Sequence, residues 1–75
     1  MQRLGKAMHI SDSKNLIVRA ESLSRLGAIV VDKNLEKIGR VFDIFGPVKE
    51  PYISVKLGVS DPEKYIGQVL YTLEA

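Results

Sequence analysis

The segment 39–56 constrains the fold of this 75-residue chain more than any other part of its sequence. Two runs of strand-forming residues, 37–45 and 52–57, flank a corner at Gly46 and Pro47. Proline has no N–H to donate to a neighbouring strand, so this corner must interrupt the sheet. Apolar and polar side chains alternate along 52–57, as they do in a strand with one buried face. The segment therefore predicts two strands joined by a stiff, apolar, proline-containing loop.

Turn-forming clusters separate four further strand-like runs from these two. The six expected strands cover residues 4–10, 16–20, 28–31, 37–45, 52–57 and 68–73. One short helical turn is expected near residues 61–66, since Ser60 or Asp61 can cap it and Pro62 fits its first turn. A chain of this length cannot form two full sheets, and closure into a barrel removes exposed strand edges. The sequence predicts an all-β, single-domain, six-stranded β-barrel over residues 1–75.

Apolar spacing also predicts which side chains face the barrel interior. Leu4, Met8 and Ile10 are expected to share one face of the first strand, and Phe42 and Tyr71 are expected in the core. Gly39 predicts a bulge or bend, because glycine weakens a regular strand. With those aromatic rings buried, an exposed platform for stacking nucleic-acid bases is not expected.

The composition narrows the classes of function. The chain has no cysteine and a single histidine, which excludes disulfides and cysteine-based zinc sites. Its 11 basic and 9 acidic residues give a net charge of +2, a weak bias compared with that of an autonomous nucleic-acid binder. The longest apolar run, residues 28–31, is too short to span a bilayer. We expect a cytoplasmic protein that contacts no membrane and needs no metal or cofactor.

No group of residues in the sequence predicts catalysis. His9 has no second histidine beside it, and Ser11, Asp12 and Ser13 are turn formers first. A nucleophile or general base would need an activating partner, which these spacings do not supply. Glycine motifs that cradle phosphates do not occur in the sequence. The chain is therefore not expected to be an enzyme.

Three basic residues near one turn are candidates for a minor contact with RNA phosphates. They are Lys33, Lys37 and Arg40. The alternative, which the composition favours, is an ordinary solvated exterior of the barrel.

The proline-containing corner is the strongest candidate for a binding surface. Phe45 and Val48 flank the Gly46–Pro47 turn, where apolar surface should stay exposed, and tyrosine is frequent at interface hot spots. The alternative is that the aromatic rings pack inward and the prolines only shape a loop. The residues expected to contact a protein partner are Ile44, Phe45, Gly46, Pro47, Val48, Pro51 and Tyr52, although Ile44 suits the core equally well.

Three segments, 31–34, 38–48 and 51–56, together resemble the central domain of one subunit of box H/ACA ribonucleoproteins. That subunit is the glycine/arginine-rich-protein (Gar) subunit of the RNA-guided pseudouridine synthase complex. The likeness extends over nearly the whole chain, and the pattern Gly-x-Val-x-Asp-x-Phe-Gly-Pro-Val is its most specific part. The chain lacks the Gly/Arg-rich tails of eukaryotic members and resembles the compact archaeal form.

The resemblance implies a six-stranded barrel similar to those of translation elongation factors, and a role without catalysis. It implies docking on the catalytic domain of a dyskerin-type pseudouridine synthase, with guide RNA and other H/ACA proteins as indirect partners. It also implies an influence on the thumb loop of the synthase, and so on substrate loading and product release in rRNA pseudouridylation. The main alternative is an independent RNA-binding barrel of the translation-factor type. A homodimer of the free protein is a further alternative, since an exposed apolar patch can pair with the same patch on a second copy.

Overall fold

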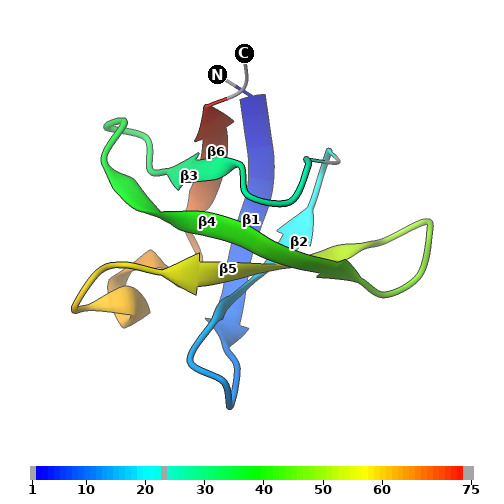
Figure 1. The fold of residues 1–75 in the computed structure, drawn as a ribbon, viewed down its shortest axis with the longest axis horizontal. Coiled ribbons are helices and arrows are strands. Elements are labelled where there is room, and N and C mark those ends of the chain that lie inside the picture. Colours follow the sequence, from blue (N-terminus) through cyan, green and yellow to red (C-terminus); the bar gives the residue numbers. More distant parts are fainter. Residues whose placement is uncertain (1, 23, 74–75) are drawn as a thin grey trace.

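Six antiparallel strands pair in the order β1-β2-β5-β4-β3-β6, and the last pairs with the first to close a barrel (Figure 1). The computed structural model describes residues 2–22 and 24–73. Its strands are β1 (Gln2–Ile10), β2 (Leu16–Ala20), β3 (Ile29–Val31), β4 (Lys37–Phe45), β5 (Tyr52–Leu57) and β6 (Val69–Leu73). The predicted six-stranded barrel is confirmed, and no helix in the described part of the chain is long and apolar enough to cross a membrane.

The core consists of inward side chains from all six strands, one side chain from a helical turn, and Ala28, which directly precedes β3. The expected turn near 61–66 is the 3₁₀ helix η1 (Pro62–Tyr65), although the Asp61 side chain makes no capping hydrogen bond. Tyr65 packs into the core from η1 and is almost fully buried. The buried cluster contains Leu4, Ala7, Leu16, Val18, Ala28, Val30, Ile38, Val41, Ile53, Val55, Tyr65 and Leu70.

Bulges decide which side chains of β1 point inward. The β1–β6 register shifts between Arg3 and Gly5, and an added residue in one strand changes the alternation of faces. Ala7 is therefore buried while Met8 is 42% exposed on the outside of the barrel. The prediction that Met8 shares the inner face with Leu4 is wrong for this reason.

The two aromatic side chains predicted in the core lie elsewhere. A register shift between β4 and β5 leaves Phe42 as the extra residue after the inward-facing Val41, so Phe42 is 57% exposed. Tyr71 is half-buried, because its neighbours Leu70 and Thr72 take the inward positions of β6. Both core predictions are therefore wrong, and Phe42 adds a ring to the outer surface.

The bulge predicted at Gly39 in β4 is confirmed by the pairing of β3 with β4. Val30 pairs with Gly39 and Val31 with Lys37, which leaves Ile38 as an extra residue beside the glycine. A Cβ atom added at Gly39 would lie 2.1 Å from the carbonyl oxygen of Lys56. Glycine is therefore required here because β4 and β5 approach more closely than a side chain allows.

The turn between β3 and β4 depends on Asp32, which is buried. Its Oδ1 atom accepts hydrogen bonds from the N–H groups of Asn34 (2.8 Å) and Glu36 (3.0 Å). Asp32→Ala leaves both donors without this acceptor and is expected to lower the free energy of unfolding by about 1 kcal/mol. Asp32→Asn keeps an acceptor oxygen and should cost less. Urea unfolding of both variants tests this, and equal stability of Asp32→Ala and the native protein would contradict it.

Candidate protein interface

Two stacked aromatic rings lie on the outside of the barrel, one at the end of β4 and the other at the start of β5. Phe45 and Tyr52 are cross-strand partners, and their ring centroids are 6.0 Å apart with an interplanar angle of 26°. Gly46 follows with φ of +93°, and a Cβ atom added there would lie 3.1 Å from Cδ2 of Tyr52. Glycine thus permits both the sharp exit from β4 and the close approach to the Tyr52 ring.

The loop 46–51 is joined to β2 at two points, although it projects from the barrel (Figure 1). Arg19 on β2 forms an ion pair with Glu50, and the Ala20 N–H donates a hydrogen bond of 3.0 Å to the Pro51 carbonyl oxygen. Val48 precedes both attachment points in the loop and is 98% exposed. The loop therefore presents an apolar side chain on a constrained backbone.

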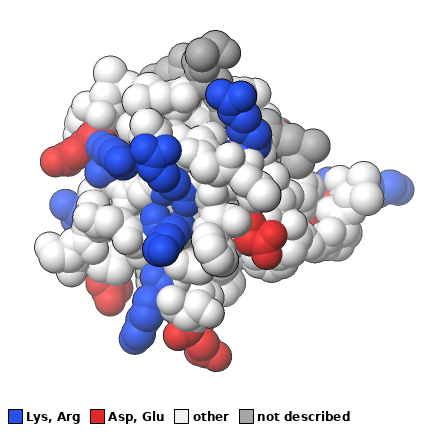
Figure 2. All heavy atoms as spheres, in the orientation of Figure 1, with Lys and Arg blue, Asp and Glu red and all other residues white. Residues whose placement is uncertain are grey.

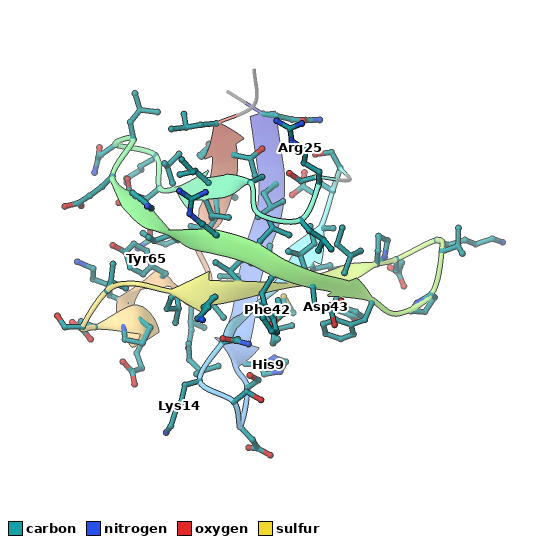
Figure 3. The ribbon with its side chains drawn as sticks, viewed as in Figure 1. His9, Lys14, Arg25, Phe42, Asp43 and Tyr65 are labelled. Atoms are coloured by element: carbon teal, nitrogen blue, oxygen red, sulfur yellow. The ribbon has the colours of Figure 1, made fainter. Side chains whose placement is uncertain are left out.

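Four neighbouring strands together form an outer apolar face. It consists of Met8 on β1, Ile17 on β2, Tyr52 on β5, and Phe42 and Phe45 on β4. Figure 3 shows the Phe42 side chain leaving β4 toward β5 and the region of His9. A groove of ≈ 340 Å³ opens in this face, lined by Met8, His9, Ser11, Ile17, Phe45 and Tyr52.

The structure brings most of the predicted contact residues to one place. Phe45 and Tyr52 lie in the outer apolar face, and Gly46, Pro47, Val48 and Pro51 form the adjoining loop. Ile44 does not belong to this surface, because it pairs with Ile53 and packs against the core. That these residues contact a partner stays a prediction.

Sequence reasoning missed Phe42, Met8 and Ile17 as members of this face. A signal existed for Phe42: it follows Arg40 by two residues, and such residues share a face of a strand. Ile17 lies on the outer side of β2, where it pairs with His9 on β1 and with Ser54 on β5. Its side chain is nevertheless buried. The side chains around it therefore cover it and form a continuous surface.

Two polar residues, His9 and Ser11, line the groove, and Ser11 has a role in the fold. His9 is exposed, and Ser11 Oγ accepts a hydrogen bond of 3.2 Å from the Asn15 N–H within the β1–β2 turn. In the described ranges, no three His, Cys, Asp or Glu side chains gather as metal ligands. The arrangement suits an apolar contact with another macromolecule.

The basic candidates divide between a turn and a strand. Lys33 is exposed in the turn after β3, whereas Lys37 and Arg40 are exposed on the outer side of β4. The structure brings Lys37 and Arg40 together on β4, and Lys33 precedes them in the β3–β4 connection.

Comparison with known families identifies the barrel. The family described as the Gar1/Naf1 RNA binding region matches residues 1–74. The chain belongs to this family. Its members are accessory RNA-binding domains related to H/ACA ribonucleoproteins, and the family is not a catalytic one. The resemblance to the H/ACA glycine/arginine-rich-protein subunit is therefore confirmed at the level of the core domain.

Two archaeal proteins are similar to this chain in sequence, and one solved structure is similar to it in fold. An uncharacterized protein of Methanothermobacter thermautotrophicus is 40% identical over 75 residues, which cover 95% of this chain and 82% of the relative. An uncharacterized protein of Methanocaldococcus jannaschii is 44% identical over 48 residues, covering 64% of this chain and 58% of that one. The structure of the Gar1 domain of Naf1 is similar in fold, with a TM-score of 0.74 at 21% identity, covering 95% of this chain and 81% of that chain.

Proposed function

We propose that this protein is a non-catalytic subunit of an H/ACA ribonucleoprotein that docks on the catalytic domain of the pseudouridine synthase. The outer apolar face and the loop 46–51 make the contact. The observation that carries this proposal is the exposure of Met8, Phe42 and Phe45 on the outer face that β1, β2, β5 and β4 form, beside a preformed Phe45–Tyr52 stack. Contiguous exposed apolar surface of this kind marks protein interaction sites.

The shape of the surface favours a rigid docking site. Arg19, Ala20 and the prolines constrain the loop before binding, which reduces the conformational entropy lost when the complex forms. The groove of ≈ 340 Å³ is large enough to accept an apolar side chain of the partner between Met8 and Tyr52. Aromatic anchors in such settings supply most of the binding energy at an interface.

Docking at this surface would change the rate of substrate loading and product release by the synthase, and not the chemical step of the reaction. A barrel fixed to the catalytic domain holds the thumb loop of the synthase in one of its positions, and thereby aids substrate RNA loading and product release. Release steps limit the rate of many enzymes, so a subunit without catalytic groups can raise the rate. Guide RNA and the other H/ACA proteins are indirect partners in this arrangement.

A turnover assay with the reconstituted complex tests the proposal. The native protein should raise the multiple-turnover rate of pseudouridylation severalfold and change the single-turnover rate less. Phe42→Lys should abolish this stimulation, because it places a charge in the apolar contact. Leu35→Lys is a matched control, since Leu35 in the β3–β4 turn is also 57% exposed. Equal stimulation by Phe42→Lys and the native protein would overturn the proposal.

A further inference from the structure

Four exposed cations share the face that β4 and β5 present. Figure 2 shows lysine and arginine side chains in a band across this face, with acidic side chains to either side. The four cations, which we call the basic band, are Arg25 before β3, Lys37 and Arg40 on β4, and Lys56 on β5. Arg40 and Lys56 are cross-strand partners. Like charges placed opposite each other destabilise a sheet, so the fold gives no reason for this pair.

Within residues 2–22 and 24–73, no carboxylate forms an ion pair with the basic band. The ion pairs in these ranges are Arg3–Glu21 and Arg19–Glu50, and neither includes a residue of the band. Arginine binds an anionic group with charge-assisted hydrogen bonds, and it often binds a carboxylate with two of them. The band is therefore a site for an anion that another molecule supplies.

A hollow with leucine side chains in its wall lies beside the two arginines of the band. Its volume is ≈ 440 Å³, and Arg25, Arg40, Leu26 and Leu73 are among its lining residues. The Arg40 Nη1 atom donates a hydrogen bond of 3.0 Å to the Gly27 carbonyl oxygen, which holds the guanidinium at the hollow. Leu26 is 62% exposed and Leu73 47% exposed. The hollow thus offers a place for an aliphatic side chain next to a site for a carboxylate.

A second hollow continues the surface along β4 and β5. Its volume is ≈ 220 Å³, and its lining includes Lys37, Arg40 and Lys56. Arg40 lines both hollows, so they adjoin. Lys37 and Arg40 are three residues apart on β4, roughly 10 Å along the strand. Carboxylates three residues apart on an extended peptide have the same spacing, so a peptide lying along β4 would match both cations.

The chemistry of the two hollows suits a peptide better than a nucleic acid. Proteins that bind single strands interleave basic residues with aromatic rings, on which the bases stack. Among the described residues, no aromatic side chain lines either hollow, and the apolar lining is aliphatic. The exposed rings of Phe42 and Phe45 belong to the outer apolar face. Carboxylates and aliphatic side chains of a protein segment would satisfy the whole lining.

We infer that the basic band binds an extended acidic segment of a partner protein. The carboxylates of this segment contact Lys37, Arg40 and Lys56, and a neighbouring aliphatic side chain enters the hollow at Arg25 and Leu26. Charge complementarity brings the segment to the band and fixes its register, and the aliphatic contact adds specificity. The inference goes beyond the proposed function, because it concerns a second protein contact that does not depend on docking by the outer apolar face.

Fluorescence anisotropy with a labelled peptide tests the inference. The probe is a short peptide with glutamate at every third position and one leucine beside a glutamate, titrated with the full chain. We expect saturable binding, and no binding of a peptide with glutamine in place of glutamate. Arg40→Gln with Lys56→Gln should bind the probe roughly fivefold to tenfold more weakly, since two ion pairs are lost. Lys6→Gln with Lys14→Gln removes the same charge elsewhere on the barrel and should bind nearly as the native protein does.

Leu26→Ser tests the hollow separately from the charges. Leu26 is exposed and outside the core, so this variant should fold. It should bind the leucine-containing peptide severalfold more weakly, because an apolar contact is lost. Its affinity for a second peptide, in which glycine replaces the leucine, should equal that of the native protein.

Four results would overturn the inference. They are an absence of binding of the acidic peptide, equal weakening in the two double variants, unchanged affinity of Leu26→Ser for the leucine-containing peptide, and binding of a single-stranded RNA of equal charge without binding of the peptide. The last result would assign the band to RNA. Phe45→Ala lines neither hollow and should keep its affinity for the peptide while losing affinity for the synthase. Failure of the docking proposal and failure of this inference therefore give different patterns.

Discussion

Replacing Tyr52 by alanine is expected to weaken binding to the pseudouridine synthase by about 1–3 kcal/mol, or roughly 5- to 150-fold in Kd. The ring is half-buried, stacks on Phe45 and lines the apolar groove, so its loss removes both an anchor and the wall of a pocket. Phe45→Ala removes the other ring of the stack and should weaken binding by a similar amount. Calorimetric titration of the synthase with each variant measures the change.

The domain should remain folded in both variants, because neither ring belongs to the buried core. Leu35→Ala is the control: Leu35 is also exposed, and it lies in the β3–β4 turn, outside the outer apolar face and the loop 46–51. The Kd of Leu35→Ala for the synthase should equal that of the native protein. Unfolding of Tyr52→Ala, seen in circular dichroism, would show that the ring serves the fold. A folded variant with the Kd of the native protein would show that the ring lies outside the interface.

Gly39→Ala is expected to destabilise the barrel by about 3 kcal/mol or more, which is a large part of the stability of a domain this small. The added methyl group would lie 2.1 Å from the Lys56 carbonyl oxygen and 3.0 Å from its carbonyl carbon. Both atoms are backbone, so no side-chain rotation relieves the contact and β4 must move away from β5. Chemical denaturation followed by circular dichroism measures the loss.

Gly58→Ala provides the comparison for this prediction. No atom lies within 4 Å of a Cβ added at Gly58. Alanine there should change the free energy of unfolding by no more than about 0.5 kcal/mol. If Gly39→Ala proved as stable as Gly58→Ala, β4 and β5 could not approach each other in the protein as closely as described.

Strand positions and the barrel followed from local signals in the sequence. The alternation in 52–57 and the turn clusters between runs placed six strands, and β5 coincides with the expected range. The helical turn was also predictable, because Pro62 after two polar residues favours a first turn. The positions of strands and turns depend mainly on residues that are close in the sequence, so local sequence patterns predict them well.

The outer apolar face was harder to predict because it depends on bulges. An extra residue in one strand reverses the alternation beyond it, and no local pattern fixed the shifts near Leu4 and Phe42. Met8, expected on the same face as Leu4, and Phe42, expected in the core, are both exposed. Phe45 and Tyr52 were recognisable as candidates because glycine and proline ended the strands beside them.

The exposed basic side chains of Arg25, Lys37, Arg40 and Lys56 illustrate a second limit of sequence reasoning. Arg25 lies in a loop and Lys56 on β5, and they join Lys37 and Arg40 only when the barrel closes. The net charge of the chain does not show this clustering. Lys37 and Arg40 were grouped with Lys33 because all three are near one turn in the sequence, whereas the contribution of Lys56 required the pairing of β4 with β5.

Titration of the purified synthase without RNA is the direct test of docking at the outer apolar face. We expect saturable binding with one barrel per synthase and a negative heat-capacity change, because apolar surface is buried. Phe42→Lys should abolish this signal and Leu35→Lys should not. Binding to RNA without any binding to the synthase would contradict the claim and favour an independent RNA-binding barrel.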